Sequence, residues 1–175
     1  TLQNGAGHIP WLTAARKQNW IYWLRYREWL EFKLSPVAID ALDQSIDRVL
    51  SLLENPQREG VWDRRGLVVG HVQSGKTSHY TGLINKAADA GYKIIIVLAG
   101  LHNNLRAQTQ MRLDEGFLGY ETGPVTGDAL RTIGVGEINS DLGIRPNFAT
   151  NRSQNGDFNT KVARNFGVSP EKRPW

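Results

Sequence analysis

A glycine-rich turn between a short apolar run and a helical segment constrains the fold of this 175-residue chain most strongly. Residues 70–77 read Gly-His-Val-Gln-Ser-Gly-Lys-Thr, a complete match to the pattern G-x-x-x-x-G-K-[ST]. The preceding residues 66–69 are typical of a buried strand, and residues 76–90 predict a helix that stops at Gly91. Strand, turn and helix in this order predict a phosphate-binding loop, because the loop amides and the helix N-terminus then favour negative charge at one point.

All eight residues of this loop are candidate ligands of a nucleotide: Gly70, His71, Val72, Gln73, Ser74, Gly75, Lys76 and Thr77. The glycines allow the chain to curl around a phosphate without a Cβ clash. We expect Lys76 to reach the β- and γ-phosphates and the Thr77 hydroxyl to ligate Mg²⁺, which makes these two the candidate catalytic residues. The implied cofactors are ATP and Mg²⁺, and a chance match to the pattern is the alternative.

A second β-branched run at residues 93–100 follows the predicted helix. An uninterrupted run of this kind is typical of a strand buried on both faces of a parallel sheet. Strand, helix and strand form a βαβ unit. We therefore predict an α/β fold, a partial three-layer P-loop (RecA-like) domain with a mostly parallel sheet, over residues 61–175. A helical appendage over residues 1–60 precedes it.

The appendage shows two helical patterns. Trp20, Trp23, Leu24 and Leu30 share one helical face within residues 11–34. These tryptophans suit base stacking as well as core packing, and their helical spacing favours the core. A second helix is predicted to begin after Ser35, with Pro36 in its first turn, and to end at residues 55–56.

The helix predicted over residues 101–113 is polar where a crossover helix would be apolar. Its amide, imidazole and guanidinium groups suit contacts with a nucleic-acid backbone, and a solvated surface helix is the alternative. The candidate nucleic-acid ligands are His102, Asn103, Arg106 and Gln108. The net charge of +4 fits a polyanionic partner, because residues 61–120 hold seven basic against four acidic residues.

Other chemistry is missing from the sequence. No apolar strand ends in the acidic pair (Walker B) with which a motor ATPase holds Mg²⁺ and polarises water, and no nuclease constellation occurs. The chain has no cysteine, no signal-peptide pattern and no apolar run near the ~18 residues of a membrane span. We therefore expect a cytoplasmic protein without membrane contact, which hydrolyses ATP barely or not at all as this chain alone.

A resemblance to a known family lies in residues 64–119, which read RRGLVVGHVQSGKTSHYTGLINKAADAGYKIIIVLAGLHNNLRAQTQMRLDEGFLG. This block is similar to the Z-one-domain proteins, large bacterial proteins described as endonucleases, with a superfamily-two helicase-like ATPase core. They are linked to restriction-modification and phage-defence clusters. The resemblance extends more loosely through FATNRSQNGDF and VARNFG.

The resemblance implies an N-terminal fragment whose acidic motif, second motor lobe and nuclease centre lie beyond Trp175. On that reading the chain is the nucleotide-binding part of an ATP-dependent, helicase-like enzyme acting on DNA, and other restriction or defence subunits are possible partners. The alternatives are a P-loop switch, a kinase or a regulatory nucleotide-binding module that does not hydrolyse and is unrelated to nucleic acid.

Overall fold

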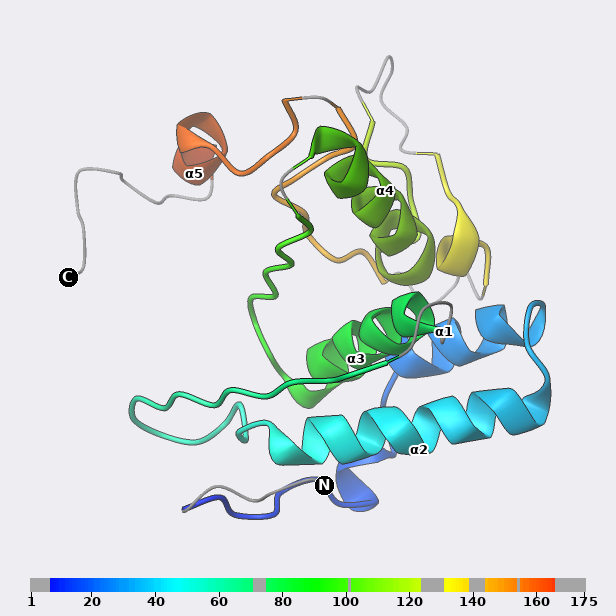
Figure 1. The fold of residues 1–175 in the computed structure, drawn as a ribbon, viewed down its shortest axis with the longest axis vertical. Coiled ribbons are helices and arrows are strands. Elements are labelled where there is room, and N and C mark those ends of the chain that lie inside the picture. The colour runs from blue at the N-terminus through cyan, green and yellow to red at the C-terminus, as the bar shows by residue number, and fades with distance from the viewer. Residues whose placement is uncertain are drawn as a thin grey trace. The chain divides into compact units, whose positions relative to one another are not determined.

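The computed structural model describes residues 7–70, 75–100, 102–123, 131–138, 144–153 and 155–165 (Figure 1). The chain divides into two compact units. The N-terminal unit comprises Thr1–Val97 with Ile138–Leu142, and the C-terminal unit comprises Leu98–Glu137 with Gly143–Trp175. The boundary that the sequence predicts between the helical appendage (residues 1–60) and the nucleotide-binding part (residues 61–175) stays a prediction.

The N-terminal unit is built from three α-helices, α1 (Tyr22–Glu31), α2 (Pro36–Leu52) and α3 (Lys76–Ala90), after a short 3-10 turn, η1 (Ala15–Lys17). Helix α3 packs against both α1 and α2 (Figure 1). The apolar side chains between the helices are almost fully shielded from solvent: Tyr26, Leu30, Ile39, Ile46 and Leu50. Burial of these faces supplies the main driving force for folding of this unit.

Close approach of the three helices depends on a glycine in α3. A Cβ atom built on Gly82 would lie 2.4 Å from Ile46 Cδ1 and 3.1 Å from the Trp23 ring. Since this glycine has no side chain, α3 can settle directly onto the facing side chains of α1 and α2. The position of α3 is therefore set by packing on two sides at mid-helix.

The N-terminus of α1 is capped by a side chain from the far end of α3. The Asp89 carboxylate accepts hydrogen bonds from the backbone N–H groups of Ile21, Tyr22 and Trp23 at 2.8–3.0 Å. A carboxylate at this place satisfies first-turn donors and favours the helix dipole. Burial raises the pKa of Asp89, and the three backbone donors oppose that rise.

The C-terminal unit has fewer regular elements. Helix α4 (Asn103–Leu113) continues into a π-helical turn, η2 (Asp114–Leu118), and is followed by a 3-10 turn, η3 (Gly134–Glu137), and a short helix, α5 (Thr160–Asn165). Tyr120 and Thr132 form an antiparallel bridge. The polar side chains of Gln110, Asp114 and Thr122 are buried in this unit, together with the apolar Leu118, Tyr120 and Val135.

The predicted α/β fold is wrong, because the structure shows neither a strand nor a sheet within the described residues. Residues 66–69 and 93–100 have no regular secondary structure and no sheet partner there. Their apolar side chains face solvent: Leu67 is 87% exposed and Ile96 is 78% exposed. A strand requires hydrogen bonds from a neighbouring strand, so β-branched composition alone does not form the three-layer, RecA-like core.

The structure confirms several predictions about the helices. Ser35 caps α2 through its Oγ, which accepts from Ala38 N, and Gly91 ends α3 with a φ of 104°. The predicted core role of the tryptophans is confirmed for Trp20 and Trp23, which are both 8% exposed, whereas Leu24 on the same predicted face is 47% exposed. Caps and amphipathic faces act within one segment, and this is why they can be recognised without knowledge of the fold.

Candidate functional site

The candidate phosphate site is the N-terminal end of α3, with Lys76 and Thr77 in its first turn, together with Gly75 and Gly70 before the helix. Gly75 is the N-cap residue and has left-handed backbone angles, φ 73° and ψ 21°, which few side-chain-bearing residues adopt. The predicted ligands His71, Val72, Gln73 and Ser74 lie outside the described residues. The motif glycine is thus placed where the chain turns into the helix.

The end of α3 is electrostatically suited to an anion. The helix has 15 residues, with no acidic residue in its first turn and no side-chain hydrogen bond to its N-cap. The positive end of the helix dipole and the first-turn N–H groups therefore lie next to Gly75, and no carboxylate of that turn neutralises them. Helix α1 differs in this respect, because Asp89 satisfies its first turn.

Lys76 and Thr77 are exposed side chains at this end. The Lys76 ammonium donates a hydrogen bond to the Gly70 carbonyl oxygen at 3.0 Å, so its charge reaches back to the first residue of the motif. The structure therefore brings together the first and the last parts of the predicted loop. An ammonium bound to the Gly70 carbonyl oxygen can exchange it for a phosphate oxygen, since both accept the same donor.

These residues fit a nucleoside triphosphate with Mg²⁺. A Cβ at Gly75 would meet no atom of the described residues within 4 Å. Thr77 offers an exposed hydroxyl as an Mg²⁺ ligand. Elsewhere in the described part of the chain, no three His, Asp or Glu side chains gather as a metal site. A magnesium ion here would depend on Thr77 and on the phosphates, not on a carboxylate cluster.

The other flank of α3 carries a buried ionic cluster that links it to α2. The Lys86 side chain is 1% exposed, and its Nζ contacts Asp43 and, at 2.5 Å, Asp47. Asp47 also pairs with Lys17 at 2.7 Å. Burial alone would raise the pKa of Asp47, but hydrogen bonds from Lys17 and Lys86 outweigh it and hold that pKa below its ordinary value. The cluster could not be foreseen, because Lys86 belongs to no sequence motif.

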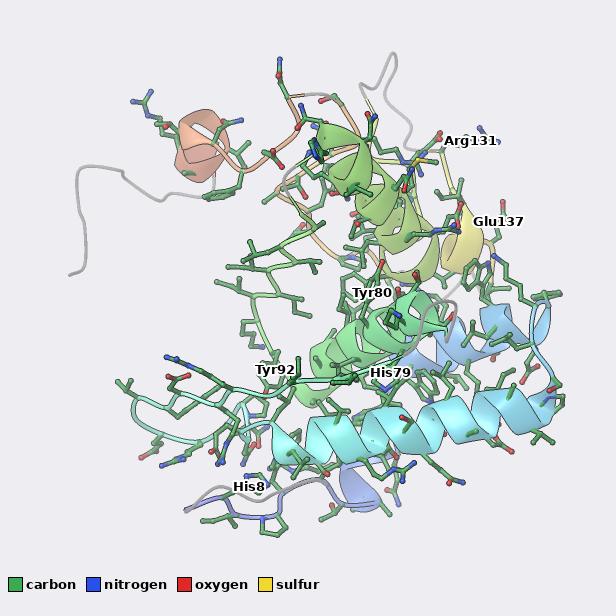
Figure 2. The ribbon with its side chains drawn as sticks, viewed as in Figure 1. His8, His79, Tyr80, Tyr92, Arg131 and Glu137 are labelled. Atoms are coloured by element: carbon green, nitrogen blue, oxygen red, sulfur yellow. The ribbon has the colours of Figure 1, made fainter. Side chains whose placement is uncertain are left out.

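Two neutral contacts hold the first turns of α3. The Tyr26 hydroxyl donates to the Ser78 carbonyl oxygen at 3.3 Å, and Ser45 Oγ lies 3.2 Å from His79 Nε2. Figure 2 shows His79 on α3 and Tyr92 beyond the other end of that helix. Burial lowers the pKa of His79 and the nearby charge of Lys86 acts in the same direction, and together they outweigh the contact with Ser45, which raises it. Neutral His79 is therefore favoured as the partner of Ser45.

The predicted nucleic-acid ligands lie on α4 and, for His102, at its N-cap, in the C-terminal unit. His102, Asn103 and Gln108 are exposed. Arg106 is half-buried; its guanidinium donates to the Asn151 carbonyl oxygen at 2.8 Å, contacts the Ser153 carbonyl and lies 3.2 Å from Asp157. Arg106 thus ties α4 to the chain around Asn151 and Asp157, and its role in nucleic-acid binding stays a prediction.

Asp114 is the residue that sequence reasoning passed over. Its carboxylate is fully buried and accepts from Gln110 Nε2 at 2.8 Å, from Thr122 N at 2.9 Å and from Arg152 Nε at 2.6 Å. Thr150 extends the network through Gln110. The sequence shows Asp114 only as a polar residue at a helix end, and nothing in the pattern separates it from a solvated one.

Comparisons with protein-family models, with characterised proteins and with solved structures find no match to this chain. Within the residues that the structure describes, no helix is both long enough and apolar enough to cross a membrane.

Proposed function

We propose that this chain binds the phosphates of ATP, together with Mg²⁺, at the N-terminal end of α3. The observation that carries the proposal is the coincidence of a complete G-x-x-x-x-G-K-T motif with a helix that begins at its lysine, next to a left-handed glycine. The α/β frame expected around the motif gives no support, so the proposal rests on the motif and on α3. Backbone N–H groups and the helix dipole would bind the phosphate oxygens.

Within this site each side chain has a distinct task. The Lys76 ammonium leaves the Gly70 carbonyl and binds the β- and γ-phosphate oxygens as a charge-assisted donor. The exposed Thr77 hydroxyl is the protein ligand of Mg²⁺, which neutralises phosphate charge. No residue of the chain is assigned to activate water, and we therefore propose binding without appreciable hydrolysis.

The wider proposal is that the chain serves as the nucleotide-binding part of an ATP-dependent, helicase-like enzyme that acts on DNA in restriction or phage defence. It is supported by the resemblance over residues 64–119 and by the basic excess around the motif. The exposed His102, Asn103 and Gln108 on α4 are the side chains available to a DNA backbone.

Calorimetric titration of ATP in Mg²⁺ tests the phosphate site. We expect Lys76→Ala to remove most of the affinity and Lys93→Ala, an exposed lysine outside the motif, to leave it unchanged. Thr77→Ser keeps the hydroxyl and should preserve the gain in affinity from Mg²⁺, whereas Thr77→Ala should abolish that gain. Equal affinities of the wild type and Lys76→Ala would refute the proposal.

The salt dependence of DNA binding tests the partner. If Arg106 exchanges an internal contact for a phosphate, Arg106→Ala should reduce the slope of log K against log salt by about 0.9 for any duplex sequence. The neutral Gln108→Ala is the control and should weaken binding without changing the slope. Absence of DNA binding by the wild type, or an unchanged slope for Arg106→Ala, would count against this contact.

A further inference from the structure

The Tyr26 hydroxyl joins helix α1 to the end of α3 that carries the candidate phosphate site. It donates to the carbonyl oxygen of Ser78, the residue after Thr77, and it is also hydrogen-bonded to Thr81 one turn further along. Tyr26 is 2% exposed, and burial raises its pKa to about 12. The hydroxyl therefore keeps its proton, and remains a donor, at neutral pH.

Mid-helix packing leaves α3 little freedom to compensate for a lost contact. Gly82, one turn beyond Ser78, is pressed against Ile46 and Trp23, and a Cβ atom built on Gly82 would lie 3.5 Å from the Tyr26 ring. The same tyrosine thus packs on the middle of α3 and binds the first turn. Since the middle is fixed, the polar contact controls how the first turn is held relative to it.

Helix α2 holds the same turn through a second contact. Ser45 lies 3.2 Å from His79, which directly follows Ser78. The first turn of α3 is thus held from two helices, just after the residues that would bind phosphate and metal. Both contacts use side chains that do not themselves reach the phosphate site.

We infer that Tyr26 is a positioning residue for the phosphate site: its hydroxyl orients the first turn of α3, and with it Lys76 and Thr77. This inference rests on the proposed function. Phosphate binding requires several N–H groups and one ammonium to converge on a small anion, so a loosened first turn costs affinity even where the fold survives.

Tyr92 provides a matched control. Its hydroxyl donates to the Glu54 carbonyl oxygen at 2.5 Å, burial raises its pKa to about 12, and it lies just beyond the C-terminal end of α3. Tyr26→Phe and Tyr92→Phe therefore delete the same type of bond in the same compact unit. Only the first deletion touches the end of α3 that carries the motif.

The experiment measures calorimetric ATP affinity in Mg²⁺ for four proteins, at a temperature well below each melting transition. We expect Lys76→Ala to lose most of the affinity, Tyr26→Phe to lose about fivefold, the factor for one neutral hydrogen bond, and Tyr92→Phe to match the wild type. The two phenylalanine variants should show similar falls in melting temperature.

The outcomes separate the two proposals. A wild type that does not bind ATP refutes the proposed function. A wild type that binds, with affinity lost in Lys76→Ala but unchanged in Tyr26→Phe, overturns the role of Tyr26 alone, as does an equal loss in Tyr92→Phe. If Tyr26→Phe does not fold, Ser45→Ala takes its place, because this variant removes the contact with His79 in the same turn. An ATP affinity of Ser45→Ala equal to that of the wild type then overturns the inference. A loss of affinity supports it.

Discussion

Ile46 and Asp114 are each fully buried at the centre of one compact unit, yet they stabilise those units by opposite means. Ile46 packs among apolar side chains of α1, α2 and α3, where the gain is proportional to the area removed from water. Asp114 is a carboxylate surrounded by donors from Gln110, Thr122 and Arg152. Transfer of this carboxylate out of water costs free energy, and only a complete set of hydrogen-bond donors offsets that cost.

This difference determines how each unit responds to damage. An apolar core loses free energy in proportion to the atoms removed, because neighbouring groups still contact one another. A polar centre fails more abruptly, since deletion of one partner leaves the other donors buried and unpaired. The apolar core around Ile46 should therefore tolerate small substitutions that the network around Asp114 does not.

The largest effect is expected from Asp114→Ala. It leaves the Arg152 Nε–H and the Thr122 N–H without their acceptor, whereas Arg152 Nη1 keeps Glu121 at 2.6 Å. The cost is about 3–5 kcal/mol in the free energy of unfolding. Hydrogen exchange should show α4 losing protection while α2 keeps it. The exposed Glu137→Ala is the control in the same unit, and similar exchange in the two variants would contradict the network.

A smaller effect is expected from Ile46→Ala. The cavity and the lost transfer free energy should lower the free energy of unfolding by about 3 kcal/mol, within the usual range for such truncations. Loss of exchange protection should fall on α1, α2 and α3. Val37→Ala, at a 79% exposed site of α2, should leave stability unchanged. Loss of exchange protection confined to α4 in Ile46→Ala would contradict this account of the two units.

The same contrast explains how much the sequence revealed. The start of α2 and the end of α3 follow from a serine cap, a proline and a glycine stop, which all act locally, whereas α2 ends at Leu52, before the predicted residues 55–56. The sheet failed because strands at 66–69 and 93–100 need partners that composition cannot supply. The spacing of the glycine-rich motif identifies Gly75 and Lys76. Tyr26 and Asp114 belong to no motif, so the sequence does not predict their contacts.

A third, smaller effect concerns pH and the ionic cluster on α3. The pKa of Asp47 is lowered in the folded protein, so its contribution is present above its ordinary pKa and is lost as the pH falls through the lowered value. Asp89 acts in the opposite sense, because its raised pKa makes stability fall as the pH rises from the ordinary to the raised value.

The difference in unfolding free energy between the wild type and Asp47→Asn should therefore shrink on acidification below about pH 4. Urea titrations at several pH values measure this difference. Asp63→Asn, which removes an exposed partner of Arg65, is the control and should show no such trend. A pH-independent difference for Asp47→Asn would mean that the cluster contributes nothing through charge.

The central claim, a nucleotide-phosphate site at the end of α3, is tested most directly by backbone amide NMR during titration with ATP and Mg²⁺. A chain of 19.6 kDa is within reach of this method. We predict saturable shifts of the amides of Gly70, Gly75, Lys76 and Thr77, larger than those of α2 or α4, and their absence with adenosine. Saturating shifts elsewhere with none at these four amides, or no shift at all at millimolar ATP, would contradict the account.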